Sequence, residues 1–70
     1  MTNTSLLREY IKKSGLKISF IAEQLGISRS WLTKKINDEV SFNQYEIADL
    51  CRLLHIETTK EKESVFFASM

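Results

Sequence analysis

Apolar residues recur along the first part of the chain at the spacing of amphipathic helices. One stripe consists of Leu6, Leu7, Tyr10, Ile11 and Ser14. A second stripe, spaced i, i+3, i+4 and i+7, consists of Ile18, Ile21, Ala22 and Leu25. Gly15 and Gly26 directly follow these stripes, where a residue that adopts positive φ without strain ends a helix. The pattern therefore predicts two short helices, and the first can be capped by Asn3, Thr4 or Ser5.

A third helix is predicted from its start signal. Ser28 is a good N-cap, and Ile27 before it can pack on Leu32 as a hydrophobic staple. The helix would run from Arg29 to about Asn37.

The clearest start signal belongs to a fourth helix. Asn43 is its N-cap, because Glu46 occupies the capping-box position three residues later. Phe42 can staple onto Ile47. The buried stripe of this helix consists of Ile47, Leu50, Cys51 and Leu54.

The tail, residues 57–70, has two interpretations. Thr58 and Glu61 can cap a short fifth helix, yet residues 64–68 also suit a strand because Val and Phe favour extended structure. The tail residues that must be buried are Val65, Phe66 and Phe67. They either dock on the chain's own core near Leu53 and Ile56 or form a dimer seam. Since no proline, repeat or linker interrupts the pattern, we expect residues 1–70 to form a single all-α domain of four to five helices.

Composition excludes several classes of function. A chain of 70 residues is too short for most enzymes, and one cysteine with one histidine cannot build a disulfide framework or a structural zinc site. We expect no cofactor and no metal. The longest apolar run, Val65–Ala68, is four residues long, whereas a bilayer span needs about 20. With no signal-peptide block at the amino terminus, the expected location is the cytoplasm.

Charge is divided unevenly along the chain. Residues 1–37 carry seven basic and two acidic residues, a net charge of +5. Residues 38–70 carry three basic and seven acidic residues, a net charge of −4. The basic part is a candidate surface for a polyanion, although small domains often scatter charge unevenly without a function.

Only Gly26, Ile27 and Ser28 separate the second predicted helix from the third, and so short a turn makes the two axes cross steeply, as in a helix-turn-helix. The run IAEQLGISRSWLTKKIN has Ala22 where two helices touch, Gly26 in the turn and Leu32 in the core of the second helix. Over about residues 5–56 the sequence resembles the Cro/C1-type, or XRE, family of regulators, especially its small phage and mobile-element members. The closing FFA also resembles the end of many small relatives. The resemblance implies a lambda-repressor-like fold with the helix-turn-helix at about residues 18–37.

The third helix has a polar arc suited to base edges. With 100° per residue and Leu32 at zero, the residues between about 60° and 200° are Arg29, Ser30, Thr33, Lys34 and Asn37. By the resemblance, the base-reading positions are Arg29, Ser30, Thr33 and Lys34. Any surface helix also has a polar arc, so the turn and the charge are needed to favour DNA.

Phosphate contacts are expected from helix amino termini and flanking bases. The candidates are Lys13, Lys17, Lys35 and Asn37. Each lysine can equally be a solvated side chain, and Lys35 can lay its stem beside Trp31. Two positions depart from the family. Ile18 replaces a common phosphate-binding Gln, and Asp38 replaces a common Gly.

The sequence thus predicts a DNA-binding regulator without catalysis, expected to be a nucleoid-associated repressor that binds near-palindromic operator DNA as a homodimer. The alternative is an antirepressor or accessory factor that grips another regulator through Phe20 and the tail. Cys51 and His55 share a helix face, as a thiol–imidazole pair would. We interpret Cys51 as a core residue and His55 as a helix-end cation.

Overall fold

The chain folds into five α-helices within residues 1–68, the part that the computed structural model describes. The helices are α1 (Thr4–Ser14), α2 (Ile18–Leu25), α3 (Arg29–Ile36), α4 (Gln44–Leu54) and α5 (Thr59–Phe66). The predicted all-α fold is confirmed, and the tail forms a helix rather than a strand between residues 59 and 66. The last two residues of the predicted tail, 69 and 70, lie outside the described residues. No helix among residues 1–68 is long and apolar enough to cross a membrane.

Local capping chemistry sets the helix boundaries. Asn3 accepts a hydrogen bond from the Leu6 amide, so it is the cap that begins α1. Asn43 and Glu46 form the predicted capping box at α4, in which each side chain accepts from the other residue's backbone amide. Gly15 and Gly26 end α1 and α2 with φ of 73° and 72°, in the left-handed region that glycine adopts without steric cost. The predicted boundaries therefore rest on backbone groups that are satisfied locally.

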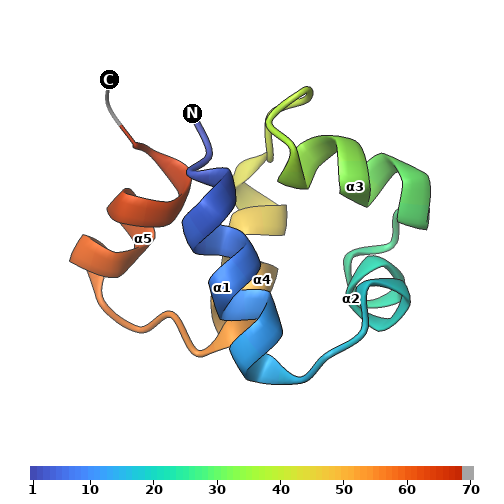
Figure 1. Cartoon of the computed structure of the whole chain (residues 1–70), viewed down its shortest axis with the longest axis horizontal. Coiled ribbons are helices and arrows are strands. Elements are labelled where there is room, and N and C mark those ends of the chain that lie inside the picture. The colour runs from blue at the N-terminus through green and yellow to red at the C-terminus, as the bar shows by residue number, and fades with distance from the viewer. Residues whose placement is uncertain (69–70) are drawn as a thin grey trace.

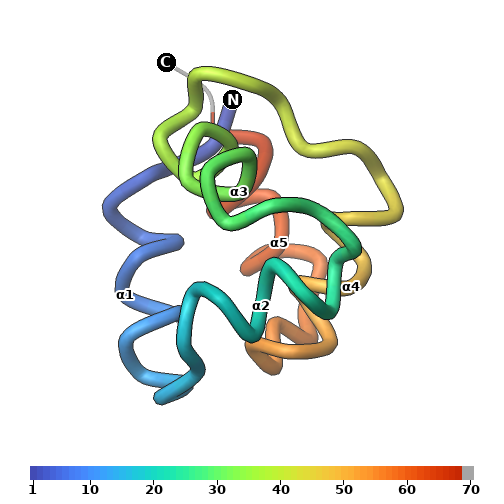
Figure 2. The backbone as a smooth tube through the Cα atoms, turned by 90° about the vertical axis from the view of Figure 1, so that its right-hand side faces the viewer, coloured from blue at the N-terminus to red at the C-terminus, as the bar shows by residue number. Residues whose placement is uncertain are grey.

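The helices surround one hydrophobic core. Figure 1 shows α2 and α3 on one side of the molecule and α5 on the other, with α1 and α4 between them. In Figure 2 the molecule is turned so that α3 faces the viewer, and α5 lies behind it. The buried apolar side chains are Leu7, Ile11, Ile21, Ala22, Leu32, Ile36, Ile47, Leu50, Leu54, Ile56, Val65 and Phe66. Every helix contributes to this set, which fixes the position of α3 relative to the rest of the chain.

The tail docks on the chain's own core through two of the three residues expected to be buried. Helix α5 packs against α1, and Val65 and Phe66 are buried. The Phe66 ring meets the Phe42 ring edge-on with centroids 5.6 Å apart, and the Val65 carbonyl accepts a 2.7 Å hydrogen bond from the Asn3 amide. Of the two alternatives left open for the tail, docking on the chain's own core describes Val65 and Phe66, because both side chains are buried within one copy of the chain. Only Phe67 points outward, 55% exposed.

Candidate nucleic-acid interface

The turn between α2 and α3 consists of three residues, as the sequence predicts. Gly26 takes a left-handed conformation, and the Ile27 amide donates a 3.1 Å hydrogen bond to the Ala22 carbonyl. Ala22 is 3% exposed, so its small side chain lies in the core, and α2 packs against α3. Ser28 then caps α3 by accepting from the Trp31 amide at 3.0 Å. The turn thus sets α3 at a steep angle across α2 (Figure 2).

The two faces of α3 lie in different environments. Leu32 and Ile36 are buried in the core. The exposed residues on the other side are Arg29, Ser30, Thr33, Lys34 and Asn37, the polar arc predicted from the sequence. Helix α5 lies on the opposite side of the molecule, so the described part of the tail does not cover this arc (Figures 1 and 2). The structure brings the four predicted base-contacting residues together on one solvent-facing surface.

Trp31 lies beside the polar arc and is 42% exposed. The ammonium groups of Lys34 and Lys35 lie 5.9 Å and 5.6 Å from the centroid of its ring. Both distances are within the range in which an aromatic face attracts a cation. The indole therefore restricts where the Lys34 ammonium lies, and it covers the stem of Lys35.

Lys35 does not face solvent, which corrects the expectation that it contacts phosphate. The residue is 5% exposed. Its Nζ donates to Glu46 Oε1 at 2.8 Å and to the Ser41 carbonyl at 3.1 Å. Drawing the Lys35 ammonium out toward a phosphate would leave the buried Glu46 carboxylate without its charged partner, which is strongly unfavourable. We leave Lys35 out of the candidate contact set.

The carboxyl end of α3 has a basic neighbour that no pattern in the sequence predicts. Arg8 on α1 donates a hydrogen bond from Nη2 to Asn37 Oδ1. Both side chains are exposed. The two residues lie 29 positions apart along the chain, so only the packing of α1 on α3 brings them together. Arg8 thus adds a guanidinium group, which suits phosphate geometry, to this end of the interface.

Asp38 follows α3 in the left-handed conformation that glycine adopts most readily. Its φ is 62°, and the Asp38 and Glu39 amides donate to the carbonyls of Lys35 and Lys34 at 3.1 Å and 2.9 Å. Asp is one of the few residues with a side chain that tolerates this left-handed conformation. Its carboxylate accepts a 3.1 Å hydrogen bond from the Thr2 amide. The Asp38 charge is therefore directed toward the amino-terminal segment.

The amino terminus of α2 differs from those of the other described helices. Asn3, Ser28, Asn43 and Thr58 cap their helices through side-chain oxygens, whereas Lys17 makes no side-chain cap at α2. The first amides of α2 are thus left without such an acceptor, and an oxyanion can fill that role. Lys13 and Lys17 are both exposed. Ile18 begins the helix without a polar side chain, so an anion there would be held by backbone amides and lysines.

Comparison with known families agrees with this geometry. A sequence model of the Cro/C1-type HTH DNA-binding domain matches residues 6–58. The chain belongs to the Cro/C1-type HTH DNA-binding domain family. Searches of curated proteins and of solved structures gave no significant match. The matched segment covers most of α1 and all of α2, α3 and α4, and it includes the whole helix-turn-helix.

Membership of the Cro/C1-type family makes this chain a DNA-binding regulator, and the family is not one of enzymes.

The candidate thiol–imidazole pair has a structural explanation. Burial raises the pKa of the Cys51 thiol, with Lys62 acting in the opposite direction. His55 ends α4 with a φ of 56°, and its backbone amide donates to the Cys51 carbonyl. A thiol with a raised pKa is poorly ionised at neutral pH and is a weak nucleophile.

Proposed function

We propose that this Cro/C1-type domain, acting as one unit over residues 1–70, represses transcription by occupying operator DNA with α3 in the major groove. The observation that carries the proposal is the exposed polar arc on the second helix of the helix-turn-helix. The base-contacting residues we propose are Arg29, Ser30, Thr33 and Lys34. Arg suits guanine, Ser and Thr serve either purine or pyrimidine, and Lys reaches guanine or phosphate. In motifs of this kind the amino-terminal residues of the second helix lie nearest the bases.

The proposed phosphate contacts flank this arc. Lys17 directly precedes the uncapped start of α2, Lys13 lies in the last turn of α1, and Asn37 with Arg8 lies at the end of α3. Helix amino termini and basic side chains bind the backbone without reading sequence. These residues would fix the angle and depth at which α3 enters the groove. Arg29 and its neighbours would then supply the discrimination between bases.

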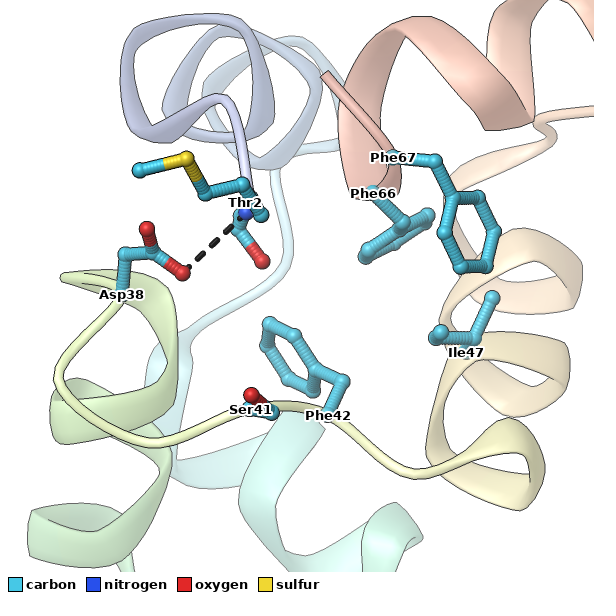
Figure 3. Close-up of a pocket in the computed structure, with 8 residues that line it drawn as sticks. Thr2, Asp38, Ser41, Phe42, Ile47, Phe66 and Phe67 are labelled. Atoms are coloured by element: carbon cyan, nitrogen blue, oxygen red, sulfur yellow. Dashed lines mark hydrogen bonds between the residues drawn. The ribbon is translucent and has the colours of Figure 1, made fainter. Parts of the chain in front are cut away.

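We propose that the active form is a homodimer and that Phe67 belongs to the seam. Phe67 is 55% exposed, and it borders a cavity of about 160 Å³ with Phe42, Ile47 and Phe66 at its wall (Figure 3). Met1, 62% exposed, lines the same cavity. Burying such apolar surface against a second copy is favourable. A symmetric dimer would bind two half-sites about 34 Å apart on one face of the duplex.

Selection of bound sequences from random duplexes tests the proposal. We expect a recovered near-palindrome whose half-sites are one helical turn apart, and binding that falls steeply with added salt because counterions are released. Recovery of no preferred sequence would contradict sequence-specific repression. If only a single half-site is enriched, base contact by α3 is supported and the proposed homodimer is contradicted.

A second candidate function is supported by Phe20. Its ring is 42% exposed on α2, away from the stripe that packs in the core. The domain would then grip another regulator as an antirepressor or accessory factor, using Phe20 and the tail. Apolar contact with a protein responds weakly to salt, whereas binding of duplex DNA responds strongly. Salt titration of the two complexes therefore separates the candidates.

A further inference from the structure

A buried cation lies on the same helix as the proposed base-contacting residues. Lys35 is 5% exposed, and its Nζ lies 2.8 Å from Glu46 Oε1 and 3.1 Å from the Ser41 carbonyl. Glu46 is 7% exposed. Among residues 1–68 the other ion pair, Arg52 with Asp49, has both side chains largely accessible to water. The Lys35–Glu46 pair thus stands out as the buried one.

The Lys35–Glu46 pair connects α3, the loop that follows it and the start of α4. Glu46 Oε1 accepts from Lys35 Nζ and also from the Asn43 amide at 2.9 Å, as part of the capping box of α4. The Ser41 carbonyl, in the loop between α3 and α4, accepts the second Lys35 hydrogen bond. Helix α3 itself packs chiefly on α2 and α1. The Lys35 side chain therefore supplies a polar tie from α3 to the start of α4.

Aromatic rings enclose this tie. Lys35 Nζ lies 5.6 Å from the Trp31 centroid and 5.9 Å from the Phe42 centroid. Phe42 in turn meets Phe66 edge-on. The rings keep water away from the pair and leave the ammonium group few alternative positions. A displacement of α3 along or around its axis would break both Lys35 hydrogen bonds at a site where the Lys35 and Glu46 side chains are largely shielded from water, so the loss would be costly.

Stability alone does not account for such a pair. Buried ion pairs often contribute no more than apolar side chains of the same volume, because desolvation offsets their attraction. Directional hydrogen bonds, however, tolerate less displacement than apolar contacts, so they can set the register of a helix that the core already holds in place. We infer that Lys35 and Glu46 are positioning residues that hold α3 at the angle and register needed for base contacts. This inference rests on the proposed DNA-binding role of α3.

The test compares an apolar replacement with a matched control. Lys35→Met with Glu46→Leu removes one cation and one anion from the buried pair, and Arg52→Met with Asp49→Leu removes the same charges from the exposed one. We expect the buried double variant to melt at or near the parent temperature. Its ratio of affinities for the selected duplex and a scrambled duplex should fall at least about tenfold. The exposed double variant should keep the parent ratio. An unchanged ratio in a folded buried variant would overturn the inference.

Two further measurements keep the outcome decisive. Lys35→Met with Glu46→Gln leaves no unpaired charge and keeps a side-chain oxygen that can accept from the Asn43 amide, so it replaces the first double variant if the latter does not fold, and the same loss of discrimination is expected. Amide hydrogen exchange at residues 33–37 needs no DNA. It should accelerate at least about tenfold in the buried variants relative to the core of α4. Unchanged exchange would overturn the positioning role. If the parent protein selects no duplex but exchange accelerates in the buried variants, the proposed DNA-binding function is contradicted, whereas the role of Lys35 and Glu46 in positioning α3 is supported.

Discussion

The Thr33 hydroxyl donates a 3.0 Å hydrogen bond to the Arg29 carbonyl, one helical turn earlier on α3. Because the hydroxyl proton is donated within the helix, Thr33 can contact DNA only as a hydrogen-bond acceptor and through its methyl group. Thr33→Val keeps the methyl group, so we expect it to cost less than about 1.4 kcal/mol of binding free energy on the selected duplex. Thr33→Asp should cost more, because a carboxylate would lie beside phosphates. Equal losses for both variants, measured by fluorescence anisotropy, would contradict this arrangement.

Lys13 tests the proposed phosphate contacts. We expect Lys13→Ala to weaken the selected and scrambled duplexes by the same factor, because a phosphate contact carries no base preference. The slope of log K against log salt should become shallower by about one. Lys60→Ala is the control, since Lys60 is exposed and belongs to α5, the helix on the side of the molecule away from α3 (Figure 1). A change in base preference with Lys13→Ala would show that the residue does not act through phosphate alone.

The neighbouring residues Phe66 and Phe67 should behave differently on substitution. Phe66 is 3% exposed and Phe67 is 55% exposed. Phe66→Ala leaves a cavity in the core, and we expect it to lower the free energy of unfolding by about 3 kcal/mol or more. Phe67→Ser should leave the unfolding of the monomer almost unchanged and weaken the proposed dimer. Denaturant unfolding and sedimentation equilibrium measure the two effects. Unaltered self-association of Phe67→Ser would remove this residue from the seam.

Helix boundaries were predictable because local groups determine them. Gly15 and Gly26 end helices through their own positive φ, and Asn43 with Glu46 begins α4 through bonds that span three residues. The polar arc of α3 followed from helical periodicity alone. Nothing distant in the sequence was needed for these features.

Features that depend on tertiary packing were not predictable. The angular position of Lys35 placed it beside Trp31, but its bond to Glu46 requires the path of the loop at residues 37–43. The contact of Arg8 with Asn37 requires α1 to cross α3. In the tail, the local preference of Val65 and Phe66 for extended structure was outweighed by burial against α1 and Phe42. Tertiary contacts thus decided what intrinsic propensity left open.

Tyr10 and Glu61 give the fold a defined pH response. The Tyr10 hydroxyl donates a 2.7 Å hydrogen bond to Glu61 Oε2 and joins α1 to α5. This bond lowers the pKa of Glu61 below its ordinary value, with a further contribution from Thr58, and it raises the pKa of Tyr10. The stabilisation from Glu61 is therefore present above its unfolded pKa and is lost as pH falls through its folded pKa. The stabilisation from Tyr10 is present below its unfolded pKa and is lost as pH rises through its folded one.

We expect Tyr10→Phe to raise the Glu61 pKa toward that of a free glutamate, as followed by carboxyl chemical shifts in an NMR titration. The control is Tyr45→Phe, because Tyr45 is 74% exposed on α4. A Glu61 pKa that does not change in Tyr10→Phe would show that the hydroxyl is not its main stabilising partner.

The most direct test of base contact by α3 is the sequence selected by Arg29→Ala from random duplexes. The account predicts that the variant still recovers the parent half-site at the other positions but loses preference at one base pair, with a cost of about 1 to 3 kcal/mol on the parent sequence. A selected sequence and affinity identical to those of the parent would contradict the claim that this face of α3 contacts bases.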